Sequence, residues 1–130
     1  MLKITRIVEY ALIAIRHMNN KNSLCSSREI SSSYNIPHEI MAKTLQKLCK
    51  IGYLNAIKGS HGGYYLNIEI DKINLIEFIE NIEGPIGIVQ CSTDNNCDLI
   101  EICNIKAPIH KINNNIRAVL SKVSLYDVAN

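Results

Sequence analysis

The sequence predicts a mainly α-helical fold with one small β-hairpin, arranged as a winged helix-turn-helix followed by a long C-terminal helix. Two segments with helical periodicity are joined by a tight Asn-Ile-Pro turn at residues 35–37. Two strand-prone segments with a glycine-rich tip follow at residues 53–67, and another helical pattern occupies residues 108–120. The chain has 130 residues, of which 47% are hydrophobic and 20% charged, so it is long enough to bury one core.

The first helix is expected from Lys3 to Met18, because apolar residues recur there at three- and four-residue steps. These residues are Ile4, Ile7, Val8, Ala11, Leu12 and Ile15. The polar residues 19–22 are expected to end this helix. A second, shorter helix to about Tyr34 is expected to begin at a capping box in residues 26–29, where a Ser oxygen accepts open N–H groups and a Glu follows.

The third helix is expected from Pro37 to Ile51, because proline suits the first turn of a helix and Gly52 suits its end. The residues predicted to line one side of this helix are Ile40, Met41, Thr44, Leu45 and Leu48. A hairpin, or wing, follows: the strand Tyr53–Ile57, a glycine-rich tip, and the returning strand Tyr64–Asn67.

The rest of the chain is predicted to contain two more helices around an irregular stretch that carries cysteines. A short amphipathic helix is expected at residues 74–81, ended by Gly84 and Pro85, and the last helix at residues 108–120. One face of that last helix is predicted to consist of Ile109, Ile112, Ile116, Val119 and Leu120. We divide the chain into a winged helix-turn-helix domain (1–84), a cysteine-bearing loop (85–107), and a final helix with its tail (108–130).

The order of the first elements is typical of a DNA-binding domain whose second paired helix enters the major groove. On that helix Gln46 is a candidate to read a base edge, and Lys43 and Lys47 are candidates for phosphate contacts. In the wing, Lys58 and His61 are candidates to reach along the minor groove. The full set of candidate DNA contacts is Ser27, Arg28, His38, Glu39, Lys43, Gln46, Lys47, Lys58, Ser60 and His61.

The alternative to DNA binding is a solvated lysine face and an ordinary hairpin turn without a ligand, since each feature alone is common on protein surfaces. The order and spacing of the elements together favour DNA binding. The formal net charge is only +2, so DNA contact must come from a local patch rather than from bulk charge.

Three cysteines with equal five-residue gaps, Cys91, Cys97 and Cys103, form a candidate iron–sulfur ligand set, since thiolates are the standard ligands of such clusters. A structural zinc site would usually contain closer cysteine pairs. The fourth ligand stays open between His110, Glu9 and a carboxylate of the loop. The alternative, free buried thiols, fits poorly with the Asp and Asn residues between these cysteines. Two further residues, Cys25 and Cys49, are expected to be packing thiols.

The sequence resembles the Rrf2 family of winged-helix regulators over nearly its whole length. The resemblance rests on ITRIVEYAL, on SSREISSSYNIPHEIMAKTLQKLCKIGYL, on the wing KGSHGGYYL, on C-x5-C-x5-C after EGPI, and on the tail INNNIRAVLSKVSLYDVA. The branch that it resembles most regulates the SUF operon for iron–sulfur assembly. The resemblance implies a homodimer built on the long C-terminal helix, which binds a palindromic operator in double-stranded DNA.

The resemblance also implies an iron–sulfur cluster, 2Fe–2S in preference to 4Fe–4S, on Cys91, Cys97 and Cys103. In NsrR-like members an acidic residue on the first helix of the other subunit completes the site, and Glu9 occupies that place here. IscR-like members use a His three residues after the last cysteine; Lys106 stands there, so that ligation is excluded. The acidic residue with which IscR-like members change operator preference is replaced by Ala42, so we expect that switch to be absent.

The sequence therefore predicts a transcription regulator that senses iron–sulfur cluster status and controls cluster-assembly genes. We expect cluster occupancy to tie the cysteine loop to the first helix and to set the spacing of the two recognition helices. Two alternatives are a nitric-oxide-sensing NsrR-like repressor and a cluster-free thiol redox regulator. An enzyme is not expected, because no Ser/His/Asp set and no phosphate-binding loop are found. With no apolar run long enough for a membrane span and no signal peptide, the expected location is the cytoplasm.

Overall fold

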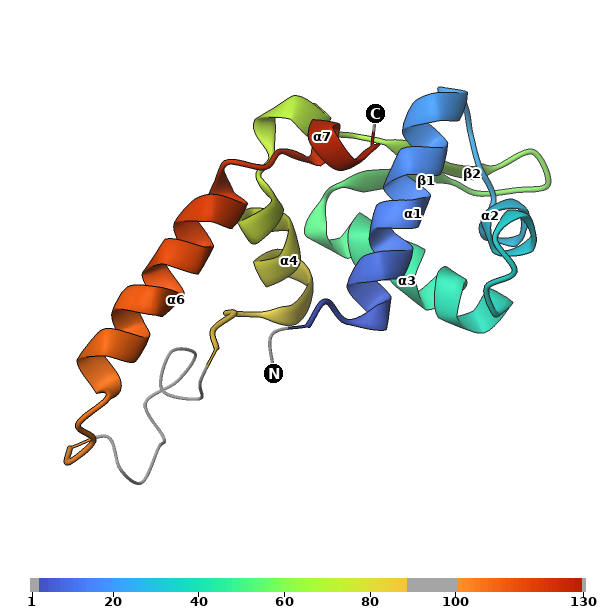
Figure 1. The fold of residues 1–130 in the computed structure, drawn as a ribbon. Coiled ribbons are helices and arrows are strands. Elements are labelled where there is room, and N and C mark those ends of the chain that lie inside the picture. Colours follow the sequence, from blue (N-terminus) through green and yellow to red (C-terminus); the bar gives the residue numbers. More distant parts are fainter. Residues whose placement is uncertain (1–2, 89–100, 130) are drawn as a thin grey trace.

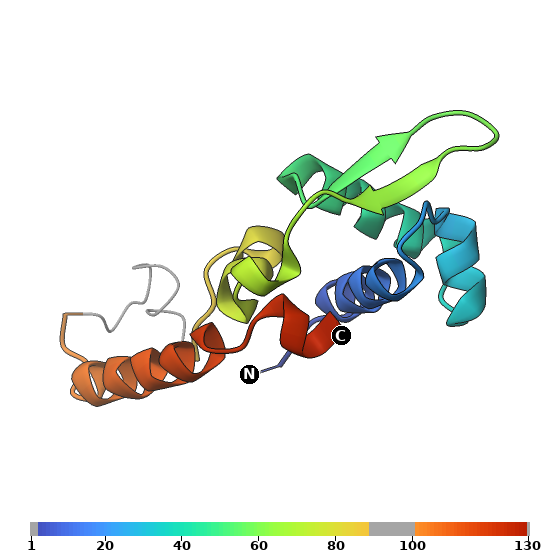
Figure 2. The same cartoon turned by 90° about the horizontal axis from the view of Figure 1, so that it is seen from above.

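The computed structural model describes residues 3–88 and 101–129 and confirms the predicted class, mainly α-helical with one antiparallel hairpin (Figure 1). The elements, in chain order, are α1 (Arg6–Lys21), α2 (Ser27–Ser33), α3 (His38–Ile51), β1 (Leu54–Ile57), β2 (Gly63–Leu66), the 3-10 turn η1 (Ile70–Lys72), α4 (Leu75–Glu83), α6 (Lys106–Ser121) and α7 (Leu125–Ala129). The hairpin projects at one end of the molecule, α6 lies at the other, and α1 and α4 lie between them (Figure 2).

Both ends of α1 differ from the prediction. The helix begins after Thr5, whose side-chain oxygen accepts a hydrogen bond from the backbone N–H of Val8, so the first predicted turn is not helical. It also continues past Met18 to Lys21. Asn19, Asn20 and Lys21 extend the helix, and Asn22, the last of the four residues that were expected to end it, does so in the left-handed conformation (φ 52°).

The core lies where α1, α3 and α4 meet. Five side chains of α1 face it: Val8, Ala11, Ala14, Ile15 and Met18. From α3, Met41, Leu45 and Leu48 are buried, together with Thr44, whose hydroxyl donates to the Ile40 carbonyl and so avoids an unpaired buried polar group. The prediction that Ile4 and Ile40 belong to the apolar faces of their helices is wrong. Ile4 precedes its helix, Ile40 lies one residue away from the buried stripe of α3, and both are exposed.

The hairpin follows Gly52, which ends α3 in the left-handed region (φ 104°). Its register pairs Leu54 with Leu66 and Ile57 with Gly63. The first strand therefore begins one residue later than predicted. A Cβ at Gly62 would lie 1.9 Å from the carbonyl oxygen of Ile57, so the return of the chain at the tip requires glycine there.

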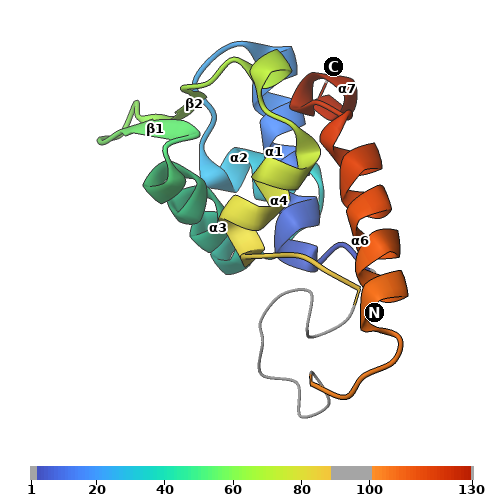
Figure 3. The same ribbon diagram turned by 90° about the vertical axis from the view of Figure 1, so that its left-hand side faces the viewer.

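The C-terminal segment returns to the helical domain. Helix α6 packs against α4 (Figure 3), and two backbone bonds then join residues 73–75 to residues 123–125: Leu75 N to Val123 O (2.7 Å) and Leu125 N to Ile73 O (2.8 Å). The tail after α6 contains a further short helix that the sequence did not indicate, α7, which packs against α1. The sequence feature that could have indicated this helix is the spacing of Ser124 and Asp127. Their backbone N–H groups donate to each other's side chains as in a capping box.

Candidate DNA interface and cluster loop

The exposed side of α3 carries the candidate DNA contacts that the sequence placed there. They are His38, Glu39, Lys43, Gln46 and Lys47, all exposed. The opposite side of the helix is held in the core, so the direction of this face is fixed by packing. It offers two ammonium groups, one carboxamide, one imidazole and the Glu39 carboxylate; the ammonium groups suit phosphates, and the other groups can meet base edges.

The first turn of α2 lies beside the start of α3. The Ser27 hydroxyl lies 3.1 Å from Nε2 of His38, which joins the two helices at their N-terminal ends. Ser27 is half-buried and Arg28 is exposed. The expected capping box forms only in part: Ser26 accepts the N–H of Glu29, but the Glu29 carboxylate is taken by Lys21 and His17.

The wing presents the other three candidate residues at its tip, where Lys58, Ser60 and His61 are exposed. The tip-side end of β2 is tied to the segment before α2, because Cys25 and Tyr64 exchange two backbone hydrogen bonds of 2.9 and 2.8 Å. A Cβ at Gly63 would lie 2.9 Å from the Cys25 carbonyl oxygen, so glycine permits this close approach. The wing is therefore attached on both sides, to α3 through the chain and to the α1–α2 connection through this bridge.

The cluster ligands are described only in part. Cys91 and Cys97 lie outside the described residues, and Cys103 is a half-buried free thiol shortly before α6. Of the candidate fourth ligands, Glu9 lies on α1 and pairs with Arg6 at 3.1 Å. His110 lies in the second turn of α6, where its Nε2 is buried and has no hydrogen-bond partner among the described residues.

The two other cysteines lie in the winged helix-turn-helix part of the chain. Cys25 is fully buried, and burial together with the nearby Glu29 carboxylate raises the pKa of its thiol to about 11. Cys49 is half-buried, and burial raises its pKa as well. Both thiols are therefore protonated at neutral pH.

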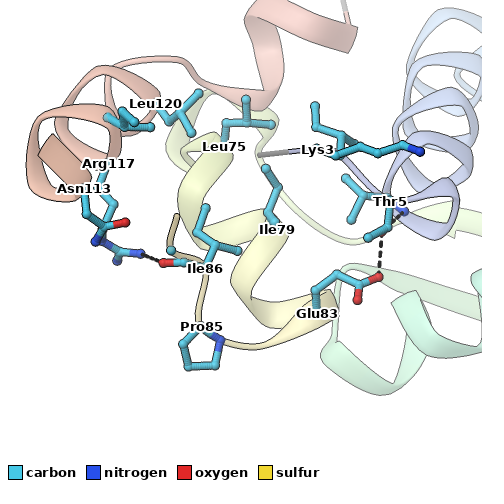
Figure 4. Close-up of a pocket in the computed structure, with 14 residues that line it drawn as sticks. Lys3, Thr5, Leu75, Ile79, Glu83, Pro85, Ile86, Asn113, Arg117 and Leu120 are labelled. Carbon is cyan, nitrogen blue, oxygen red and sulfur yellow. Dashed lines mark hydrogen bonds between the residues drawn. The ribbon is translucent and has the colours of Figure 1, made fainter. Parts of the chain in front are cut away.

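A cavity of about 400 Å³ that the sequence did not indicate lies between the start of α1, α4 and α6 (Figure 4). Apolar side chains dominate its lining, and two of its polar side chains are held by hydrogen bonds. Thr5 donates to Glu83 (2.8 Å), and Arg117 binds the carboxylate of Glu80 (2.7 Å) and the carbonyl of Ile86 (3.3 Å). This cavity separates the start of α1 from α6, on the side where the chain leaves α4 toward the cysteines.

A family model described as an iron-dependent transcriptional regulator, Rrf2, matches residues 4–130. The chain belongs to the Rrf2 family. It is 30% identical over 131 residues to the HTH-type transcriptional regulator NsrR of Bacillus licheniformis, covering 98% of this chain and 92% of that protein. Among solved structures it is similar to CymR, the global cysteine regulator of B. subtilis, with a TM-score of 0.76, 26% identity, and coverage of 99% and 97% of the two chains. The fold also matches T. potens IscR, with a TM-score of 0.72, 20% identity, and coverage of 97% and 85%.

Membership of the Rrf2 family makes this protein a DNA-binding transcriptional regulator and not an enzyme, as the sequence predicted. The winged helix-turn-helix of the described residues matches the fold of these relatives. In the part of the chain that is described, no helix has the length and apolar character that a membrane crossing requires.

Proposed function

We propose that this Rrf2 protein is a homodimeric cytoplasmic regulator that binds a palindromic operator and changes its DNA affinity with the state of an iron–sulfur cluster. The observation that carries the DNA part is the exposed polar face of α3, backed by a buried face and followed directly by the wing. Gln46 is assigned to base readout, and Lys43 and Lys47 to phosphates. Lys58, Ser60 and His61 are assigned to the DNA beside the wing.

The proposal of a homodimer rests on α6 and the segment before it. Ile105, Ile112 and Val119 recur at seven-residue steps and are all exposed, Val119 by 64%. An exposed apolar stripe with this period is typical of a helix that packs against another helix. A second copy of the chain is the partner that the Rrf2 resemblance implies, and a two-fold pair of α3 helices would fit the two halves of a palindrome.

The proposed cluster ligands are Cys91, Cys97 and Cys103, completed by Glu9 of the second copy or by His110. The donor set suits the group, because three thiolates are standard ligands and one carboxylate or imidazole can take the fourth place. Two observations are in accord with it: the Cys103 thiol is free, and Nε2 of His110 is buried without a partner among the described residues. When bound, the cluster would supply sensitivity to oxidants, nitric oxide and iron supply.

The residues of the chain would transmit the state of the loop through α6. Cys103 lies three residues before this helix, and Arg117 of α6 binds Glu80 of α4. A loop held by its three cysteines fixes the start of α6, and a released loop does not. Because α6 carries the proposed dimer contact, its position sets the separation of the two α3 helices and so the fit to the operator.

The SUF-type resemblance suggests iron–sulfur assembly genes as the target. A nitric-oxide sensor is the second candidate, since the NsrR of B. licheniformis is 30% identical to the chain. A cluster-free thiol regulator is the third, since the fold is similar to that of CymR. Cluster type, nitric-oxide titration and metal analysis distinguish the three.

The first experiment is an anaerobic absorption spectrum with iron and sulfide analysis, on wild type, Cys97→Ala and the control Cys49→Ala. We expect charge-transfer bands in wild type and control that are lost in Cys97→Ala. A colourless, iron-free wild type after anaerobic reconstitution would contradict the cluster.

The second experiment compares DNA affinities. An operator is selected from a random-sequence DNA library, and its affinity for holo and apo protein is measured at one fixed salt concentration. The switch requires different affinities. Equal affinities would leave the DNA-binding assignment intact and exclude control by the cluster.

A further inference from the structure

Three side chains with metal-ligating atoms meet between α1 and α2, away from the cysteine loop and apart from the DNA-contact set on α3. His17 comes from the last turns of α1, Cys25 from the connection, and Glu29 from the first turn of α2. One ligand atom of each, an imidazole nitrogen, a thiol sulfur and a carboxylate oxygen, lies within 4.8 Å of the other two. The proposed function uses none of these three side chains.

The donor types suit a borderline divalent ion. Nitrogen, sulfur and oxygen ligands of this kind bind Zn²⁺, and three protein ligands with a water molecule complete a common four-coordinate site. The three side chains are buried to different degrees: Cys25 is fully buried, whereas the side chains of His17 and Glu29 are 18% and 33% exposed. The water ligand would bind on the exposed side of His17 and Glu29, in the place that the Lys21 ammonium now takes.

The orientation of His17 is fixed from behind. Its Nδ1 lies 2.9 Å from the Tyr34 hydroxyl, and its Nε2 is directed at Glu29 at 2.8 Å. In many metal sites the histidine nitrogen that does not bind the ion forms such a hydrogen bond. Here the bond of Nδ1 to Tyr34 would fix the ring and leave Nε2 for the ion. Tyr34 would hold this outer position, accepting from Nδ1–H.

Positive charge already gathers at the carboxylate. The Lys21 ammonium lies 2.6 Å from Glu29, and Lys21 and then His17 hold the pKa of Glu29 below its usual value. The thiol of Cys25 faces the same carboxylate and keeps its proton. A divalent ion would displace Lys21, whose side chain is 42% exposed, and would release one proton from the Cys25 thiol.

We propose that Nε2 of His17, Sγ of Cys25 and the carboxylate of Glu29 form a second metal site, for Zn²⁺ or a similar divalent transition-metal ion. The ion would connect α1 to α2, the helix that precedes α3. Because Cys25 also bridges to Tyr64 of β2, the same ion would hold the tip-side end of this strand of the wing. Occupancy of the site would therefore stiffen the DNA-binding part of the chain independently of the cysteine loop.

The test is a Co²⁺ titration of the iron-free, full-length protein carrying Cys103→Ser, which weakens the loop as a competing site. We expect one equivalent of Co²⁺ to give thiolate-to-cobalt absorption that Zn²⁺ abolishes. Cys25→Ser should remove this absorption, His17→Gln should weaken binding at least about tenfold, and Tyr34→Phe by roughly tenfold. The matched control Cys49→Ser should leave the titration unchanged.

Lys21→Met separates a metal site from a mere ion-pair network. Removal of the ammonium that competes for Glu29 should tighten Co²⁺ binding. If the three side chains form only an ion-pair network and no metal site, the substitution should not tighten Co²⁺ binding. Circular dichroism of each metal-free variant checks folding, and if Cys25→Ser does not fold, the partly exposed His17→Gln decides. Absence of the absorption, its persistence in Cys25→Ser, or an unchanged affinity in both His17→Gln and Lys21→Met would overturn the proposal. Cluster formation is measured separately, so its failure would not affect this result.

Discussion

Gln46 and Lys43 are neighbours on the exposed face of α3, but their chemistry suits them to different tasks. A carboxamide can donate and accept at once, so it can form a bidentate pair with an adenine edge. An ammonium on a long flexible stem is a point charge that suits any phosphate. Substitutions at these two positions should therefore differ in kind as well as in size.

Gln46→Ala is expected to weaken binding to the selected operator by about 1–3 kcal/mol and to relax the base preference at one position in each half-site. The measurement is a set of titrations at fixed salt with operators that each carry one base-pair change. An equal loss on every one of these DNAs would contradict base readout by this residue.

Lys43→Ala is expected to weaken binding almost equally on all DNA sequences, because the phosphate backbone is the same in each. The slope of log K against log salt should become shallower by about 0.9 per lost contact. In a dimer with two equivalent contacts the expected change is roughly twice that. A control, Lys72→Ala, changes an exposed lysine outside the proposed interface, on η1, and should leave the slope unchanged.

Sequence periodicity was enough to identify the candidate contacts on α3, because the helical repeat decides which residues can be buried together. All of them are exposed there, and only Ser27 of the whole described set is partly covered. The contact between Ser27 and His38, and the use of Glu29 by His17 and Lys21, could not be predicted. These depend on how α1, α2 and α3 are placed in space, on which the local pattern carries no information.

Among the elements, the wing depends on close backbone approaches at its glycines, and the one at Gly62 is the tightest. A side chain at Gly62 would clash with the Ile57 carbonyl across the hairpin, so Gly62→Ala should destabilise the protein by roughly 1–3 kcal/mol, because the backbone must shift to relieve this contact. Urea unfolding is the measurement. The nearby control Ser60→Ala changes an exposed residue and should stay within about 0.5 kcal/mol of wild type. Equal stabilities of the two variants would mean that the tip can rearrange.

The contact between α4 and α6 should depend on pH. Arg117 holds the pKa of Glu80 below its ordinary value, so the ion pair stabilises the folded state at neutral pH. This contribution is present above the ordinary carboxyl pKa and is lost as the pH falls through the lower, folded-state value. It should amount to about 1 kcal/mol or less, because solvent reaches the Arg117 side chain.

The check on this pair is urea unfolding of wild type and Glu80→Gln between neutral pH and about pH 3. The difference in unfolding free energy between the two proteins should shrink as the pH falls. A difference that stays constant over this range would show that the pair contributes nothing to folding.

The elements themselves were predictable to different degrees. The helix pair, the hairpin and the last helix follow from periodicity and from glycine positions. The ends of α1 did not, because Thr5 and Asn22 act as caps only in the backbone conformations that they adopt. Helix α7 was missed because a five-residue helix has little periodicity of its own and is stabilised by packing on α1.

For the molecule as a whole, the apolar stripe of α6 is the strongest sign of a partner. Val119→Glu should place a charge in the proposed dimer contact and convert the protein to monomers, with much weaker operator binding. Asn114→Glu, on the opposite side of α6 and also exposed, is the matched control and should remain a dimer. Light scattering after gel filtration measures the mass. A monomeric wild type, or an unchanged mass of Val119→Glu, would contradict dimerisation through α6.

The backbone bonds between residues 73–75 and 123–125, together with the bonds from Arg117 to Glu80 and Ile86, hold the C-terminal part of α6, and the helix can turn about Arg117. The part of α6 from Arg117 back to Lys106 forms a lever arm of roughly 16 Å, so a rotation of about 5° displaces its far end by roughly 1.4 Å. Cys103 lies just beyond that far end. In the proposed dimer, a small displacement at Cys103 would become a change in the angle of α6, and that change, repeated about a two-fold axis, would alter the spacing of both recognition helices at once.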